Sequence, residues 1–120
     1  MDVKIEMFNE VVVLVPVGNL VASTAEFFKS QVAKLLEKRF LLLLIDMSKT
    51  DFMDSSGLGA CMAAHKSIAE QGGVLVCCNL NDTITKVFKI TRAINKINTT
   101  EGRQEGIKMV QDLAIARREP

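Results

Sequence analysis

The chain has no tryptophan and no tyrosine, and it has a single histidine, two prolines and three cysteines. Phenylalanine supplies the only aromatic rings, so platforms for stacking nucleobases or sugars are scarce. An excess of one charge is also missing, because 15 Lys+Arg stand against 14 Asp+Glu for a formal net charge of +1. Nucleic acid and anionic membranes are therefore not expected as the main partners.

Long hydrophobic runs are absent too. The longest apolar runs, VVVLVPV at 11–17 and FLLLLI at 40–45, fall far short of the roughly 18 to 20 residues that a spanning helix needs. The first residues do not have the pattern of a signal peptide. We therefore expect a cytoplasmic protein without a membrane span.

Side chains that bind metals or form disulfides are few. Cys77 and Cys78 are neighbours inside an apolar stretch, no CxxC spacing occurs, and His65 is the only possible companion ligand. The pattern predicts buried structural thiols, with no metal, disulfide or cofactor site. A lone histidine such as His65 is most often solvated or hydrogen-bonded structure rather than a catalytic base.

What the chain does have is the composition of one globular domain. Hydrophobic residues make up 48% of it and charged residues 24%. A compact domain of 120 residues buries roughly two thirds of the surface of its unfolded chain. We therefore expect a single domain over residues 1–120 with one core.

Hydrophobic periodicity predicts a sheet that is mostly parallel. Residues 3, 5 and 7 are apolar and alternate with charged residues, which is typical of an edge strand. Asn9-Glu10 makes a turn into residues 11–17, which are apolar throughout, as in a strand covered on both faces. FLLLLI, ending at Asp46, reads as a central strand, VLVCC at 74–78 as another, and AINKIN at 93–98 as a weak edge strand.

Helices are expected between these strands. Ser23 and Glu26 have the spacing of a capping box before a helix over 24–38. A second helix follows residue 56, and Asn81 or Asp82 can cap a third. The last is predicted within 99–118, which completes an α/β fold with an N-terminal hairpin and about four helices. The predicted core consists of Val12, Phe28, Leu35, Leu42, Leu44, Val74, Val76 and Phe88, and the second helix turns Leu58, Cys61, Met62, Ile68 and Ala69 to one side.

The stretch DSSGLG, 54–59, follows the carboxyl end of the central strand, where open α/β sheets place their sites. Ser55 or Ser56 would be the N-cap or first residue of the second helix, and one serine is enough for a cap. Gly57 and Gly59 stand where a helix prefers alanine and leave the surface bare. A phosphate there would meet the positive end of the helix dipole. A plain serine cap and a phosphorylation switch both remain open.

These residues carry a family resemblance. LLLLIDMSKTDFMDSSGLGACMAAHKSIAEQGG at 41–73 and LNDTITKVFKIT at 80–91, in this order of elements, resemble the STAS domain of bacterial anti-sigma factor antagonists. The resemblance implies a partner-switching protein that binds an anti-sigma factor and thereby frees a sigma factor. That anti-sigma factor is a serine kinase with a histidine-kinase-like ATP-binding fold, and a phosphatase of the protein phosphatase 2C type reverses its modification.

The resemblance also assigns roles. Ser56 matches the phosphoacceptor, with Ser55 as the second candidate, and Asp54 matches the motif aspartate. The implied partner-binding positions are Met53, Asp54, Ser55, Gly57 and Leu58. One departure concerns Val21, which stands where many relatives have an acidic residue, so the partner surface is expected to differ there.

Two other functions compete with this interpretation. An enzyme with Ser56 as nucleophile needs a base, and His65 lies nine residues on, about 13 Å along a helix, so catalysis is not expected. The closer alternative is a STAS scaffold or accessory subunit of a stress-signalling complex or a lipid transporter. Such an interface is static and does not need a phosphorylatable serine.

Overall fold

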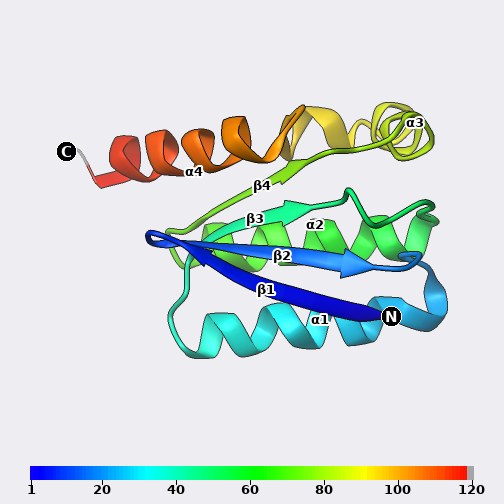
Figure 1. Ribbon diagram of the computed structural model, residues 1–120, viewed down its shortest axis with the longest axis horizontal. Coiled ribbons are helices and arrows are strands. Elements are labelled where there is room, and N and C mark those ends of the chain that lie inside the picture. Colours follow the sequence, from blue (N-terminus) through cyan, green and yellow to red (C-terminus); the bar gives the residue numbers. More distant parts are fainter. Residues whose placement is uncertain (119–120) are drawn as a thin grey trace.

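The computed structural model describes residues 1–118 and contains a five-stranded mixed sheet with helices on both faces (Figure 1). The strands are β1 (Asp2–Phe8), β2 (Val11–Val17), β3 (Leu42–Asp46), β4 (Val74–Cys78) and β5 (Asn98–Thr100). The helices are α1 (Ala22–Glu37), α2 (Ser55–Glu70), α3 (Asp82–Ile90) and α4 (Arg103–Arg118), with a short 3₁₀ helix at Ala93–Asn95.

The strands lie in the order β1-β2-β3-β4-β5. Only β1 and β2 pair antiparallel, and the other neighbours are parallel. The hairpin closes through Asn9 and Glu10, and Asn9 has a φ of 55°, the left-handed conformation that tight two-residue turns require. The predicted α/β fold with an N-terminal hairpin is confirmed.

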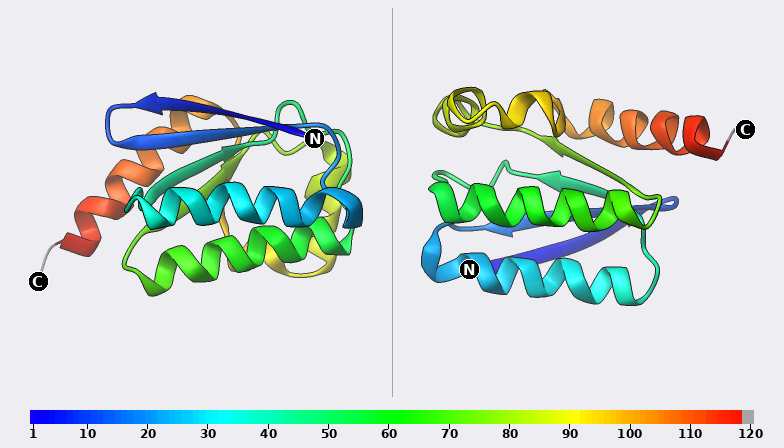
Figure 2. Two further views of the ribbon diagram at one scale, coloured as in Figure 1. Left: turned by 90° about the horizontal axis from the view of Figure 1, so that it is seen from below. Right: turned by 180° about the vertical axis from the view of Figure 1, so that it is seen from behind.

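Alternating side chains divide the core into two layers. One cluster, which includes Leu14, Leu43 and Phe28, lies between the sheet and the helices α1, α2 and α3. The other, which includes Leu44, Val76 and Val110, lies between the sheet and α4. Figure 2 shows α1 and α2 side by side on one face, with α4 on the other. Strands covered on both faces are apolar at every position, which explains the continuous runs in β2, β3 and β4.

The start of α1 differs from the expectation. The helix begins at Ala22, and Ser23 and Glu26 are exposed and do not form a capping box. Thr24 takes that role, because its Oγ1 accepts the Val21 N–H at 3.0 Å and donates to the Asn19 carbonyl at 2.7 Å.

The predicted strand at 93–98 is also wrong. Its first three residues form the 3₁₀ helix, Ile97 is buried, and β5 begins only at Asn98. The helix α4 starts at Arg103, within the predicted range 99–118. Of the predicted core, only Leu42 is partly exposed, and Ala69 of the second helix is exposed.

None of the helices in residues 1–118 combines the length and the apolar character that crossing a membrane requires.

Candidate functional site

The first turn of α2 is capped by Asp54, not by a serine. The Asp54 side chain accepts the Gly57 N–H at 2.9 Å, and Ser55 is the first helical residue. Both Ser55 and Ser56 are exposed. Within residues 1–118 neither hydroxyl has a hydrogen-bond partner, so a serine cap is wrong, whereas the other predicted placement, a serine as the first residue of the helix, is confirmed for Ser55. Both hydroxyls are left available to another molecule.

Asp54 also joins two helices. Its second carboxylate oxygen accepts the N–H of Ala22, the first residue of α1, at 3.1 Å. The N-termini of α1 and α2 therefore converge on one carboxylate. The hydrogen bond from the Gly57 N–H lowers the pKa of Asp54 most. Partial burial acts to raise this pKa, but the hydrogen bond from the Ala22 N–H adds to the lowering, and the pKa is lowered overall. The residue stays negatively charged at neutral pH.

The loops before the two helices run side by side. The Leu20 N–H donates to the Phe52 carbonyl at 3.0 Å, and the Asp54 N–H donates to the Leu20 carbonyl at 3.2 Å. Gly57 is needed for this approach, since a Cβ there would lie 2.0 Å from the Leu20 carbonyl oxygen. Gly57 is thus buried, against the expectation of a bare surface, whereas Gly59 is exposed with open space where a Cβ would be.

Further hydrogen bonds hold the loop from β3 to α2. Thr50 Oγ1 donates to the Pro16 carbonyl at 3.0 Å, and Asn81 Nδ2 donates to the Asp51 carbonyl at 2.9 Å. Asn81 Oδ1 also accepts the Ile84 N–H at 2.8 Å, so the predicted cap of α3 is confirmed and doubles as a loop anchor. The surface around Ser56 is therefore presented by a fixed backbone.

The structure separates the sequence-predicted site residues into two groups. Ser55 and Ser56 are exposed and Asp54 is half-buried. Met53 and Leu58 are only 1% and 7% exposed and pack in the core beneath the site. Gly57 lies beneath the surface as described above. Val21, the departing position, is the half-buried N-cap of α1.

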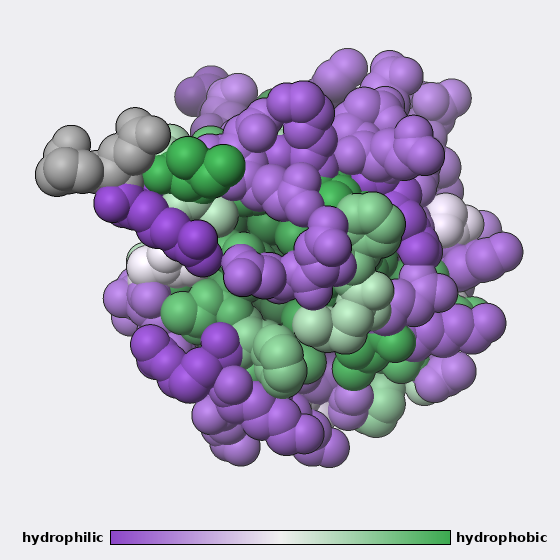
Figure 3. Space-filling model, turned by 60° about the vertical axis from the view of Figure 1, so that its left-hand side comes forward, coloured by the Kyte–Doolittle hydropathy of each residue, from purple (hydrophilic) through white to green (hydrophobic). Residues whose placement is uncertain are grey.

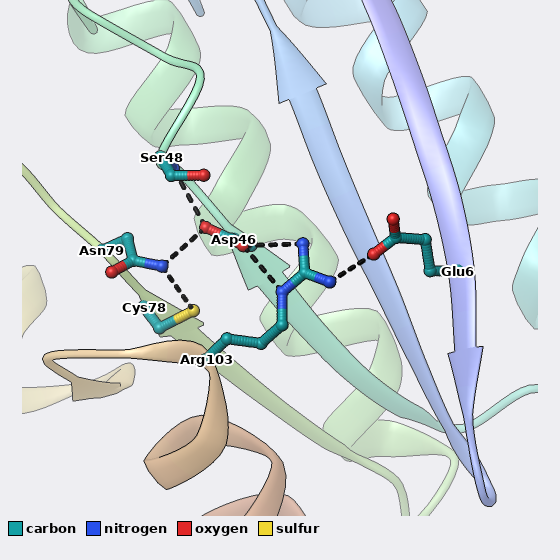
Figure 4. Close-up of polar contacts among 6 residues, drawn as sticks. All are labelled: Glu6, Asp46, Ser48, Cys78, Asn79 and Arg103. Carbon is teal, nitrogen blue, oxygen red and sulfur yellow. Dashed lines mark hydrogen bonds and ion pairs between the residues drawn. The ribbon is translucent and has the colours of Figure 1, made fainter.

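A second polar cluster lies at the same end of the sheet and was missed by sequence reasoning (Figure 4). Asp46, 2% exposed, accepts hydrogen bonds from Asn79 Nδ2, from Arg103 Nε and from the Ser48 N–H, at 2.9, 2.9 and 3.0 Å. Arg103 also pairs with Glu6 of β1. Burial acts to raise the pKa of Asp46, but these hydrogen bonds together outweigh it and lower the pKa. The cluster fastens the start of α4 to β1, β3 and β4.

The cysteines lie in the core and His65 lies at its margin. Cys61, Cys77 and Cys78 are buried and free, and burial raises the pKa of the Cys61 thiol to about 12. His65 is half-buried, and burial, with the charge of Arg117, lowers its pKa. Its Nδ1 is enclosed without a hydrogen-bond partner among the described residues, while the side chain as a whole is half-exposed. Residues 1–118 contain no cluster of acidic, cysteine or histidine side chains suited to a metal ion.

The N-terminus of α2 lies at the edge of the sheet where the parallel strands β2, β3, β4 and β5 end. This arrangement is found in a known family of domains. The model of the STAS domain matches residues 2–106, and the chain belongs to the STAS domain family. It is 33% identical over 91 residues to the anti-sigma-B factor antagonist of Listeria monocytogenes serovar 1/2a, covering 74% of this chain and 80% of that protein. It is 27% identical over 94 residues to the anti-sigma F factor antagonist of Paenibacillus polymyxa, covering 76% and 80%.

Solved structures show the same fold. A candidate anti-sigma factor antagonist from Thermotoga maritima superposes with a TM-score of 0.87 at 24% identity, covering 91% of this chain and 94% of that one. The Bacillus cell fate determinant SpoIIAA in its phosphorylated form superposes with a TM-score of 0.69 at 22% identity, covering 91% and 99%.

Proposed function

We propose that the chain is an anti-sigma factor antagonist that binds an anti-sigma serine kinase and is switched off when that kinase phosphorylates Ser56. The names of the curated relatives support the first part. The observation that carries the second is the exposed Ser56 hydroxyl in the first turn of α2, which has no hydrogen-bond partner within residues 1–118. A kinase can reach it without breaking any contact of the fold.

The electrostatics of the site favour a modification that the free protein tolerates. A phosphate adds about −1.5 to −2 charges at pH 7. It would stand beside the Asp54 carboxylate, but at a point where the positive ends of both α1 and α2 meet. The two helix dipoles offset the repulsion between phosphate and carboxylate, so we expect the fold to survive phosphorylation.

The complex with the kinase should tolerate a phosphate on Ser56 less well than the free protein does. A partner docked over Ser56 and the bare Gly59 has to bury the phosphate or move away, and an unpaired buried charge is strongly unfavourable. Met53, Gly57 and Leu58 would contribute from beneath, by holding this surface in place. In this proposal the protein binds and is modified, and it catalyses no reaction. A phosphatase of the protein phosphatase 2C type would restore it.

The test uses the histidine-kinase-like anti-sigma factors of the same organism, with ATP. Wild type, Ser56→Ala, Ser56→Asp and the matched control Ser55→Ala are incubated with each kinase. The modified residue is mapped by mass spectrometry, and binding is measured by calorimetry. We expect Ser55→Ala to behave as wild type, Ser56→Ala to bind without being modified, and Ser56→Asp to lose most of its binding while melting near the wild-type temperature.

Three results would overturn different parts of the proposal. Full modification of Ser56→Ala would move the switch to another residue. Equal binding by Ser56→Asp, or binding of no kinase by the wild type, would remove the electrostatic switch and favour a static scaffold or accessory subunit.

A further inference from the structure

The two edges of the sheet differ in length and polarity. At one edge, β5 has three residues, all of them polar. At the other, β1 has seven residues, contains no proline and pairs with β2 along its whole length without a bulge. A long, straight edge strand is a template for pairing with another chain unless it is blunted. Nothing within residues 1–118 covers the outer side of β1.

Apolar side chains of β1 are exposed along this edge. Ile5, Met7 and Phe8 are 46%, 55% and 54% exposed, and the apolar face that Val3, Ile5 and Met7 share is packed against the core only at Val3. Beyond Met7 lies a hollow whose lining is mixed, with the apolar Phe40 beside charged residues such as Arg39 and Arg117. Figure 3 shows green residues gathered around this end of the molecule.

The backbone of β1 offers a defined set of groups to a further strand. In an antiparallel pair, successive residues direct their N–H and C=O groups alternately to one neighbour and to the other side. A two-residue turn is closed by the pair Phe8 and Val11, which therefore face each other. It follows that Val3, Ile5 and Met7 direct their backbone groups to the open edge.

The charges of β1 indicate which strand can pair with its open edge. Lys4 and Glu6 lie on the same face of the strand, on either side of Ile5, and both are exposed. Glu6 also pairs with Arg103 of its own chain, but its side chain remains 51% exposed and can meet a second cation. When an identical strand pairs antiparallel about a two-fold axis at Ile5, Lys4 of each copy lies opposite Glu6 of the other. Opposite charges at directly facing positions stabilise a strand pair, and like charges destabilise it. Moving the axis by one residue places Lys4 against Lys4 or Glu6 against Glu6.

We propose that a second copy of this chain occupies the edge, through antiparallel pairing of β1 with β1 in the register centred on Ile5. This register pairs all seven residues of the strand, brings Val3 of one copy against Met7 of the other, and joins the two sheets into one. The interface is small, so the dimer is reversible. Because the strands of the two copies run in opposite directions, the two Ser56 sites lie at opposite ends and both stay accessible. The inference does not depend on the function of Ser56.

Charge reversal tests the register. Sedimentation equilibrium from about 10 µM to about 1 mM spans the range expected for a small interface. The wild type should rise from monomer towards dimer mass. Lys4→Glu and Glu6→Lys should each weaken association by about tenfold or more, because each dimer contains the charge pair twice. Glu6→Lys also removes the ion pair with Arg103 of its own chain, so Lys4→Glu is the cleaner of the two probes. An equimolar mixture of these two variants should associate again, since only their heterodimer restores opposite charges.

The control and a second readout keep the outcome unambiguous. Lys86→Glu in α3 changes the net charge as Lys4→Glu does, far from β1, and should associate as wild type; thermal melts confirm that all variants fold. Amide hydrogen exchange at both ends of the concentration range should show added protection at Val3, Ile5 and Met7. Monomer mass throughout, protection elsewhere, or a mixture that stays monomeric would overturn the proposal.

Discussion

Two aspartates near the carboxyl end of the sheet, Asp46 and Asp54, use their charge in opposite ways. Asp46 is buried and meets side chains, above all Arg103 and Asn79, so its partners come from strands and helices that it fastens together. Asp54 lies at the surface and meets backbone N–H groups at two helix starts. The first arrangement stabilises the fold. The second shapes a surface and leaves the neighbouring serines without a structural task.

The difference predicts where mutations change stability and where they change binding. The largest effect should fall on the Asp46 side of the sheet, at Leu44, which is fully buried beneath α4. Leu44→Ala should lower the free energy of unfolding by about 2 to 5 kcal/mol, because it leaves a cavity in a packed core. Urea titration measures it. A loss below about 1 kcal/mol would contradict the central position of β3.

On the Asp54 side, two glycines of one helix should respond with opposite signs. Gly57→Ala forces a Cβ against the Leu20 carbonyl and should cost about 1 to 3 kcal/mol as the paired loops separate. Gly59→Ala meets open space and should stabilise α2 by about 0.5 to 1 kcal/mol, through helix propensity alone. Urea titrations of both variants, with kinase binding as a second readout, test whether the close approach of the loops requires Gly57. Equal stability of the two variants would show that it does not.

Asp46→Asn should have a smaller effect that depends on pH. The lowered pKa means that the charged form stabilises the folded state above the ordinary carboxyl value of about 3.9, and this contribution is lost as pH falls through the folded-state pKa. At pH 7 the variant should be less stable by about 1 to 2 kcal/mol, through weakened hydrogen bonds to a charged group. The deficit relative to wild type should shrink below about pH 4. A deficit that is constant from pH 7 to about pH 3 would mean that the charge of Asp46 is not involved.

These residues also show how far the sequence could lead. The buried strands could be predicted because a strand covered on both faces is apolar at every position, which is visible in a short stretch of sequence. The motif around Ser56 was recognisable because its residues are contiguous. The contact of Asp54 with the start of α1 could not be predicted, because its partner Ala22 lies 32 residues away in the sequence. The start of α1 was itself predicted wrongly, because Ser23 and Glu26 have the spacing of a capping box that does not form. Asp46 and Arg103 are 57 residues apart, so nothing local marks them as partners.

The prediction of a strand at 93–98 was wrong for a different reason. Ile94 and Ile97 are three apart, a spacing that suits a helical turn as well as the end of a strand, and short apolar segments cannot be assigned from periodicity alone. Tertiary packing decides, and it buries Ala93 and Ile97 while the 3₁₀ helix leads the chain to the edge of β4. The strand then needs only the three residues that pair with Val76, Cys77 and Cys78.

The smallest effect on stability is expected for Asp54→Asn, which should instead change how two amide chemical shifts depend on pH. Asparagine caps helices as well as aspartate does, so Asp54→Asn can still accept the Gly57 N–H. Its amide group, however, would turn a donor towards the Ala22 N–H, and the bridge to α1 should break. Folding should change little, because the backbone hydrogen bonds of Leu20 still hold the two loops together. Kinase binding should weaken, because the carboxylate no longer fixes the first residue of α1 against the first turn of α2. Asp51→Asn, in the same loop, is the matched control.

Amide chemical shifts followed against pH test the shared carboxylate directly. In the wild type, the Gly57 and Ala22 amides should titrate together with one midpoint below the ordinary carboxyl value, because the same lowered pKa controls both. In Asp54→Asn neither amide should titrate, and in Asp51→Asn both should behave as in the wild type. If the two wild-type amides titrate with different midpoints, Asp54 does not bridge the helices in solution. The starts of α1 and α2 would then be joined only through the backbone hydrogen bonds of Leu20.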